Sequence, residues 1–269
     1  MKVAALQMTA GIRVDANLAT ARRLLQIAAG AGATLAVLPE NFAFMGRDEA
    51  DKRAVAESPG AGPIQDCIAG LAQELAITIV AGTLPLKVQG EARFAAASLV
   101  FGPEGGQLAR YDKIHLFDVD LPGKAESYRE SAGTAPGHEV VVAATPAGRI
   151  GLSVCYDLRF AELYRSMSAQ DAQLFVVPAA FTVPTGEAHW DVLLRARAIE
   201  NLCYVVAAAQ WGSHENGRAT YGNSLVVDCW GEVIERLPAG EGCVVADLDF
   251  DRQAALRARF PALAHRVLD

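Results

Sequence analysis

Cys155 is the residue of this sequence best placed to act as a nucleophile, because it stands where a predicted strand ends. The apolar residues 149–154 are expected to form that strand, and residues 160–169 have the period of a helix. A thiol at such a strand-to-helix turn lies near backbone N–H groups, which are expected to lower its pKa and to bind an oxyanion. Cysteine is also among the residues most often buried, so position alone leaves a packing role open.

Two charged residues end other predicted strands and could assist such a nucleophile. Glu40 follows the strand expected at residues 34–38 and is flanked by aromatic residues, so desolvation is expected to raise its pKa toward that of a general base. Lys113 ends the strand expected at residues 107–113, where its ammonium could stabilise an oxyanion. Glu130, further along, is a candidate second acid. Taken alone, Glu40 also fits a helix cap or a surface site, Lys113 a surface site at a strand end, and Glu130 a solvated loop.

Strands and helices alternate along the chain, which predicts an α/β fold. Helices are expected at residues 16–29, 63–76, 160–169 and 189–201. Strands are expected at residues 2–8, 34–38, 77–84, 95–101, 107–113, 140–144, 149–154, 173–177, 203–210, 221–227, 232–236 and 243–248. The segment 114–137 has no clear period and is expected to be a long ordered loop.

The second half of the sequence repeats the pattern of the first. LAVLPENFAF (residues 35–44) aligns with LFVVPAAFTV (174–183), and ASLVFGPEG (97–105) aligns with NSLVVDCWG (223–231). Two such halves can pack as two layers. No linker separates them, so residues 1–269 are expected to form a single domain.

Composition excludes several classes of function. The net charge is −7 and no run is rich in Lys and Arg, which argues against a nucleic-acid partner. No stretch approaches the roughly 20 apolar residues that span a bilayer, and the N-terminus lacks the pattern of a signal peptide. The five scattered cysteines favour free thiols in a reducing compartment. The protein is therefore expected to be cytoplasmic, without membrane or nucleic-acid partners.

Three segments resemble, in this order, the signature segments of the nitrilase superfamily of carbon–nitrogen hydrolases: LPENFAF, YDKIHLFD and GLSVCYDLRF. The resemblance extends over nearly the whole chain. It implies a catalytic triad of Glu40, Lys113 and Cys155, with Glu130 at the position of a second family glutamate. It also implies an α-β-β-α four-layer sandwich of two pseudo-repeated halves. Superfamily members assemble as homodimers or larger homo-oligomers, and residues 252–269 are a candidate part of the interface.

The reaction implied by this resemblance is hydrolysis of a small amide through a thioester on Cys155, with release of ammonia or an amine. Glu40 is expected to transfer protons, while Lys113 and the backbone N–H of Tyr156 hold the oxyanion. This chemistry needs no metal or organic cofactor, and Cys and His spacings typical of zinc are missing.

Within the superfamily, the sequence resembles the Nit branch, which holds deaminated-glutathione amidases and ω-amidases acting on α-ketoglutaramate-like compounds. The segment RARAIENLCYVVAAAQ is more similar to the first group. Both substrates carry a 2-oxo acid group, and Arg159 is a candidate for its carboxylate because a guanidinium binds carboxylates bidentately. An ion pair of Arg159 with Asp157 or Glu162 remains open. Phe181 and Thr185 are candidate substrate contacts, or else simple loop packing.

Other functions also remain open from the sequence. The same three residues would serve an ω-amidase, a nitrilase or an N-carbamoyl amino acid hydrolase. A papain-like enzyme would instead use His115 or His189 as its base. An inactive scaffold or binding protein is the alternative outside the enzymes, although all three triad positions keep reactive residue types.

Overall fold

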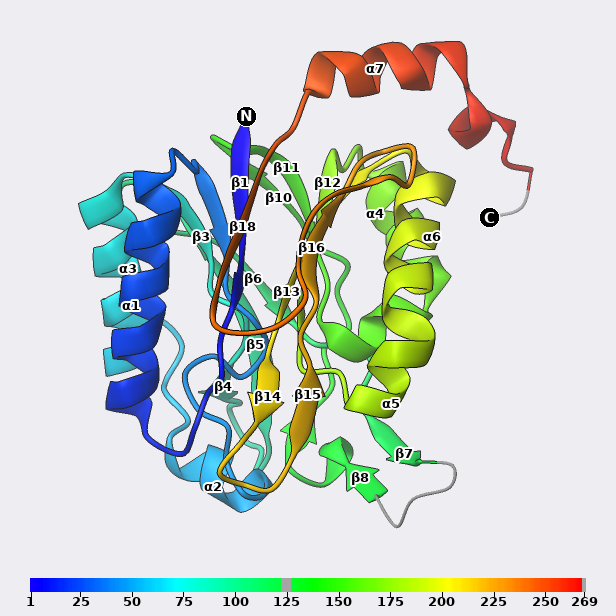
Figure 1. The fold of residues 1–269 in the computed structure, drawn as a ribbon. Helices are drawn as coiled ribbons and strands as arrows, with labels where there is room; N and C mark the ends of the chain where they lie inside the picture. Colours follow the sequence, from blue (N-terminus) through cyan, green and yellow to red (C-terminus); the bar gives the residue numbers. More distant parts are fainter. Residues whose placement is uncertain (122–126, 268–269) are drawn as a thin grey trace.

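Two β-sheets pack face to face, and helices cover the outer surface of each sheet (Figure 1). The structure is a computed structural model that describes residues 1–121 and 127–267. The covering helices are α1 (Val14–Gly30) and α3 (Pro63–Leu75) on one side, and α4 (Ala161–Ala169) and α6 (Asp191–Asn201) on the other. This order of layers confirms the predicted α-β-β-α sandwich.

The first sheet has the strand order β18-β1-β2-β3-β5-β4, and β6 and β9 also pair with β5. Its strands are β1 (Lys2–Gln7), β2 (Leu35–Val37), β3 (Thr78–Val80), β4 (Leu84–Lys87), β5 (Phe94–Phe101), β6 (Gln107–Asp112), β9 (Thr134–Ala135) and β18 (Gly242–Asp247). β1, β2 and β3 are parallel, and β18 lies antiparallel to β1. A strand from the end of the chain thus completes the sheet that the first strand begins.

The second sheet has the order β10-β11-β12-β13-β16-β17. Its strands are β10 (Val142–Thr145), β11 (Gly148–Leu152), β12 (Leu174–Ala179), β13 (Tyr204–Ala209), β16 (Ser224–Val227) and β17 (Val233–Leu237). Each sheet contains an antiparallel neighbour, then three parallel strands, then an antiparallel hairpin. This shared topology confirms the predicted pseudo-repeat.

The central strands are buried on both faces, as β1 illustrates. Val3 and Ala5 belong to the apolar cluster between the sheets, whereas Ala4 and Leu6 belong to the cluster that contains the inner face of α1. All four side chains are fully buried. Alternate residues point to opposite faces of a strand, so such a strand must be apolar at every position. This rigid double-sided core fixes the positions of the strand ends.

Residues 114–137 depart from the predicted long loop. The segment contains β7 (Asp118–Asp120) paired with β8 (Ser127–Arg129), followed by the 3₁₀ helix Glu130–Ala132 and by β9. Residues 122–126 of the segment lie outside the described residues. Strands of two or three residues are too short to leave a periodic signal in a sequence, which explains the error.

A small hairpin of β14 (Trp211–Ser213) and β15 (Ala219–Tyr221) was not predicted either. The strand expected at residues 221–227 begins only at Ser224. Figure 1 shows that this hairpin, the short helix α2 (Glu49–Ala54) and the β7–β8 pair gather at one end of the sandwich. Two short helical segments, α5 (Val183–Thr185) and the π-helix Gly186–Trp190, lead into α6.

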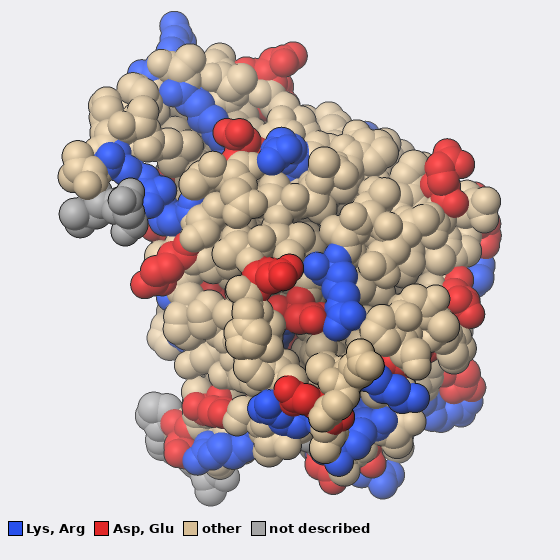
Figure 2. All heavy atoms as spheres, turned by 180° about the vertical axis from the view of Figure 1, so that it is seen from behind, with Lys and Arg blue, Asp and Glu red and all other residues tan. Residues whose placement is uncertain are grey.

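The helix α7 (Phe250–Arg259) lies at the opposite end and extends away from the sheets (Figure 1). In the rear view of Figure 2 it forms a separate lobe that carries basic side chains. Arg257 attaches this helix to the body by donating hydrogen bonds to the carbonyl oxygens of Leu202 and Ala172. The short 3₁₀ helix Ala262–His265 follows.

Charged side chains on the face in Figure 2 are interspersed rather than gathered into one basic area. Within residues 1–121 and 127–267, no helix is both long enough and apolar enough to cross a membrane.

Candidate active site

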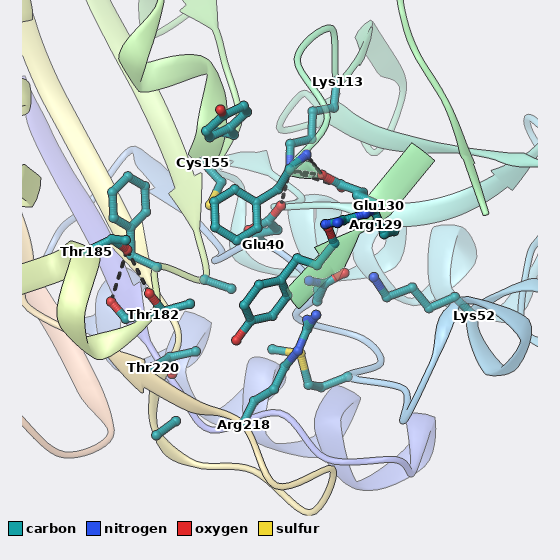
Figure 3. A pocket seen from close by; sticks show the side chains of 18 of the residues that line it. Glu40, Lys52, Lys113, Arg129, Glu130, Cys155, Thr182, Thr185, Arg218 and Thr220 are labelled. Atoms are coloured by element: carbon teal, nitrogen blue, oxygen red, sulfur yellow. Dashed lines mark hydrogen bonds and ion pairs between the residues drawn. The ribbon is translucent and has the colours of Figure 1, made fainter. Parts of the chain in front are cut away.

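Glu40, Lys113 and Cys155 follow three different strands and meet at one point inside the molecule (Figure 3). The Lys113 Nζ lies 2.8 Å from Glu40 Oε1, and the Cys155 thiol lies beside the Glu40 carboxylate, close enough for each to shift the pKa of the other. All three residues are at most 8% exposed. The structure thus brings together the three predicted residues, and it encloses them away from bulk water.

The turn that presents Cys155 has an unusual backbone. Val154 is extended, Cys155 has φ of +48°, and the 3₁₀ helix Cys155–Arg159 begins at once. A positive φ costs free energy for any residue with a Cβ, and such strain is found at functional sites. The backbone of Ala180, which follows β12, approaches Cys155 and acts weakly to lower the pKa of its thiol.

Lys113 is held between two carboxylates. Besides the contact with Glu40, its Nζ lies 2.9 and 3.0 Å from the two oxygens of Glu130. Glu130 in turn accepts a hydrogen bond of 2.7 Å from the backbone N–H of Phe117. Burial alone would lower the pKa of Lys113, but the charges of Glu130 and Glu40 outweigh it and raise that pKa well above its usual value. The ammonium is therefore permanent at physiological pH.

The expected pKa shifts of Glu40 and Cys155 were both wrong in sign. Burial does raise the pKa of Glu40, but the charge of Lys113 and the hydrogen bonds from Cys155 and Lys113 outweigh it, so the pKa lies below its usual value. The pKa of Cys155 is raised well above its usual value, first by burial and then by the charge of Glu40. The resting state is thus a neutral thiol beside a carboxylate.

These shifts predict a broad plateau in the pH dependence of turnover. With Glu40 as the predicted general base and Cys155 as the predicted nucleophile, the competent state needs Glu40 ionised, which fails only below its lowered pKa, and Cys155 protonated, which fails only above its raised pKa. We expect kcat/KM for a substrate with no group titrating nearby to stay flat from about pH 5.5 to about pH 8.5. The measurement is a steady-state pH profile. A fall in kcat/KM on the acid side of the profile with an apparent pKa of about 6 to 7 would instead indicate a general base whose pKa is raised by desolvation.

Asp157 connects the segment after Lys113 with the turn at Cys155, a role that sequence reasoning missed. This fully buried carboxylate accepts hydrogen bonds from the Tyr111 hydroxyl at 2.7 Å, the His115 backbone N–H at 3.0 Å and the Val154 backbone N–H at 2.8 Å. Asp157 stands two residues after Cys155 and was considered only as an ion-pair partner of Arg159. Its burial alone distinguishes it from a surface acid.

A pocket opens in front of these groups, at the end of the sandwich that carries α2 and the two small hairpins. The predicted Tyr156, Arg159, Phe181 and Thr185 all line it, together with Glu40, Lys113, Glu130 and Cys155. The Arg159 guanidinium lies over the rings of Tyr156 and Phe181, and its nitrogens are 3.3 Å from His189 Nδ1. It therefore contacts His189 rather than Asp157 or Glu162.

Three further cations line the pocket and were not foreseen: Lys52, Arg129 and Arg218. Lys52 comes from α2, in a stretch of polar residues without a clear signal. Arg218 comes from the β14–β15 connection, which was not recognised as a hairpin.

Neither histidine of the rival papain-like mechanism is placed to act as a base. His115 Nδ1 lies 2.7 Å from Asp157 Oδ1, and its ring stacks on Phe160 at 3.6 Å. His189 is exposed beside Arg159. Among the described residues that line the pocket, none is a histidine. In the described part of the chain, no group of three or more His, Cys, Asp or Glu side chains could hold a metal ion.

The family comparison agrees with this geometry. A family model described as carbon-nitrogen hydrolase matches residues 2–258. The chain belongs to the carbon–nitrogen hydrolase family. This membership confirms the resemblance found in the sequence and the prediction that the protein is a hydrolase.

Relatives of this hydrolase are similar over nearly its whole length. A protein named deaminated glutathione amidase from Synechocystis sp. is 44% identical, over 98% of this chain and 97% of that protein. The crystal structure of Saccharomyces cerevisiae Nit3, a member of branch 10 of the nitrilase superfamily, matches with a TM-score of 0.90 and 28% identity, covering 100% of this chain and 97% of Nit3. The C. elegans NitFhit protein matches with a TM-score of 0.91 and 36% identity. The match covers 99% of this hydrolase and 65% of the NitFhit chain.

Proposed function

We propose that this hydrolase is an amidase that cleaves deaminated glutathione through a thioester on Cys155. The observation that carries the proposal is the buried group of a thiol, a carboxylate and an ammonium at the base of a pocket rich in cations. The similarity to proteins named deaminated glutathione amidase supports the choice of substrate. The reaction would yield 2-oxoglutarate and cysteinylglycine.

In the first half of the proposed reaction, Glu40 removes the thiol proton while the sulfur of Cys155 forms a bond to the amide carbonyl carbon. The carbonyl π electrons move to oxygen, and Lys113 and the backbone N–H of Tyr156 hold the resulting oxyanion. When the carbonyl reforms, the C–N bond breaks and Glu40 gives its proton to the leaving amine. Glu130 keeps the Lys113 ammonium in place through both of its oxygens.

In the second half, Glu40 takes a proton from water, and the oxygen of that water attacks the thioester carbonyl. Collapse of this second intermediate breaks the C–S bond, and the proton on Glu40 returns to sulfur. The low pKa of Glu40 and the high pKa of Cys155 favour this return, so the resting thiol is restored.

The acyl part of the substrate has a 2-oxo acid carboxylate, and Arg159 is proposed to bind it. The support is the position of this guanidinium in the pocket wall, in contact with the rings of Tyr156 and Phe181. Water is partly excluded from such a site, which strengthens a charge-assisted hydrogen bond. Phe181 and Thr185 are proposed to contact the same acyl chain.

The experiment is a direct comparison of substrates. Deaminated glutathione and α-ketoglutaramate both yield 2-oxoglutarate, so one assay of this product ranks them, and a simple nitrile and an N-carbamoyl amino acid complete the set. The highest kcat/KM is expected for deaminated glutathione. Faster turnover of α-ketoglutaramate would make the protein an ω-amidase instead. Intact mass after treatment with an electrophile tests the scaffold alternative, because an inactive protein would leave Cys155 unmodified.

We further propose that the protein is cytoplasmic and a homodimer or larger homo-oligomer. The five free cysteines support a reducing compartment. An exposed apolar surface on and around α6, made by Val192, Ile199, Trp230 and Phe260, supports self-association. The rings of Trp230 and Phe260 contact each other, so the predicted segment 252–269, of which residues 268–269 lie outside the described residues, adjoins this surface.

The variant Ile199→Glu is expected to convert the assembly to a monomer, because a charge would be buried in the apolar interface. Light scattering coupled to size-exclusion chromatography measures the change. Ile27→Glu is the matched control, since Ile27 on α1 is equally exposed at 49% but lies on the other side of the sandwich. An Ile199→Glu protein of unchanged mass would place the interface elsewhere.

A further inference from the structure

A row of three aromatic rings lines the pocket and has an arginine at each end. The ring centroids of Tyr128 and Phe117 are 5.1 Å apart, and those of Phe117 and Tyr156 are also 5.1 Å apart. Arg218 lies over Tyr128 at 4.6 Å, and Arg159 lies over Tyr156 at 5.8 Å. A guanidinium thus contacts the ring at each end of this series, and all five residues line the same pocket.

The charge of Arg218 has no counterpart in the described part of the protein. Arg129, also in the pocket, forms an ion pair of 2.9 Å with Asp120, but no described carboxylate forms an ion pair with Arg218. Figure 3 shows its side chain pointing into the pocket from the β14–β15 connection. A guanidinium that faces a cavity and has no ion-pair partner among the described carboxylates is suited to bind an anion of a ligand.

The connection that carries Arg218 is held firmly in place. Its neighbour Asn216 accepts a hydrogen bond from the Arg218 backbone N–H at 3.0 Å and donates one to the Gly46 carbonyl oxygen at 2.8 Å. The buried His214 joins the Ala10 carbonyl oxygen to the Thr220 hydroxyl, and burial lowers the pKa of this imidazole and keeps it neutral. The backbone at Arg218 is therefore held in place before a ligand binds, which reduces the conformational entropy lost on binding.

We propose that Arg218 binds the carboxylate of the leaving group and thereby selects a peptide-like amide over a primary amide. This inference rests on the proposed function. Deaminated glutathione has one carboxylate on its acyl part and a second on its terminal glycine, on the other side of the scissile amide. In α-ketoglutaramate the leaving group is ammonia, so this substrate has no leaving-group carboxylate for Arg218 to bind.

The test compares three substrates in two proteins. Arg218→Met keeps the contact with Tyr128 but removes the charge, and the substrates are deaminated glutathione, its glycine carboxamide and α-ketoglutaramate. For deaminated glutathione, kcat/KM is expected to fall roughly 10- to 100-fold in the variant, mainly through KM, because one charge-assisted contact is lost. For the carboxamide and α-ketoglutaramate it is expected to change less than about 2-fold. Arg218→Lys is expected to recover part of the loss.

Arg23→Met serves as the control, because Arg23 pairs with Glu241 on the surface, away from the pocket. Equal losses on all three substrates, or no loss on deaminated glutathione, would overturn the role of Arg218. If the wild type preferred α-ketoglutaramate, both the proposed function and this inference would be rejected. The inference alone would be rejected if the wild type preferred deaminated glutathione and the Arg218→Met variant kept the same ratio of kcat/KM between deaminated glutathione and α-ketoglutaramate.

Discussion

Replacing Cys155 by alanine is expected to lower kcat for deaminated glutathione by roughly 10⁴-fold or more, because no other group can form the thioester. The remaining residues would still bind substrate, so KM is expected to change little. The decisive readout is a single-turnover experiment followed by intact mass, in which the wild type accumulates an acyl-enzyme and the variant does not.

The matched control is Cys229→Ala, because Cys229 is also buried but lies in the β16–β17 turn, away from the pocket. Its turnover is expected to remain within about 2-fold of the wild type. The free energy of unfolding of Cys155→Ala is expected to stay within about 1 kcal/mol, since one small side-chain atom is removed and the backbone turn is unchanged. A variant with substantial residual turnover would exclude the thioester mechanism.

The second large effect is expected for Lys113→Met, which should reduce kcat roughly 10³-fold or more by removing the main oxyanion partner. It should also destabilise the protein by about 3–5 kcal/mol, because the buried Glu40 and the partly buried Glu130 would be left around an apolar side chain. The two carboxylates would repel each other, and the pKa of at least one of them would rise. Urea unfolding and steady-state kinetics measure the two effects separately.

The double variant Lys113→Met with Glu130→Gln separates stability from catalysis. Removing one of the two repelling charges is expected to restore part of the stability, while turnover stays as low as in the single variant. Recovery of turnover together with stability would mean that Lys113 acts only by holding the site together. No recovery of stability would mean that repulsion between Glu130 and Glu40 does not cause the destabilisation.

The residues that follow predicted strands were identified from the sequence, whereas Arg218 and Asp157 were not. Glu40 and Cys155 follow strands whose apolar runs are visible, Lys113 follows the second strand of a predicted hairpin, and the repeat between the halves made the two-layer packing apparent. Arg218 precedes a strand of three residues, whose conformation depends on tertiary contacts rather than on local pattern, and it was missed. Glu130 begins an equally short 3₁₀ helix, and it was singled out as a candidate acid only because of its residue type and the family resemblance. Asp157 looked like a surface acid because the residue type alone does not show whether an aspartate is buried.

The signs of the pKa shifts could not be obtained from local sequence either. Aromatic neighbours of Glu40 suggested desolvation, and burial does act in that direction. The deciding charge is on Lys113, more than 70 residues away, and its distance of 2.8 Å emerges only in the fold. The same holds for Cys155, whose helix-start position suggested a low pKa, while burial and the nearby Glu40 carboxylate determine a high one.

The antiparallel pairing of β1 with β18 has a consequence for synthesis on the ribosome. β1 ends at Gln7 and its partner begins at Gly242, so at ordinary elongation rates roughly 10–50 s pass between their emergence. During that interval one edge of an apolar strand lacks its hydrogen-bonding partner, and such edges recruit other chains. A nascent polypeptide of this fold is therefore expected to depend on chaperone shielding late into translation.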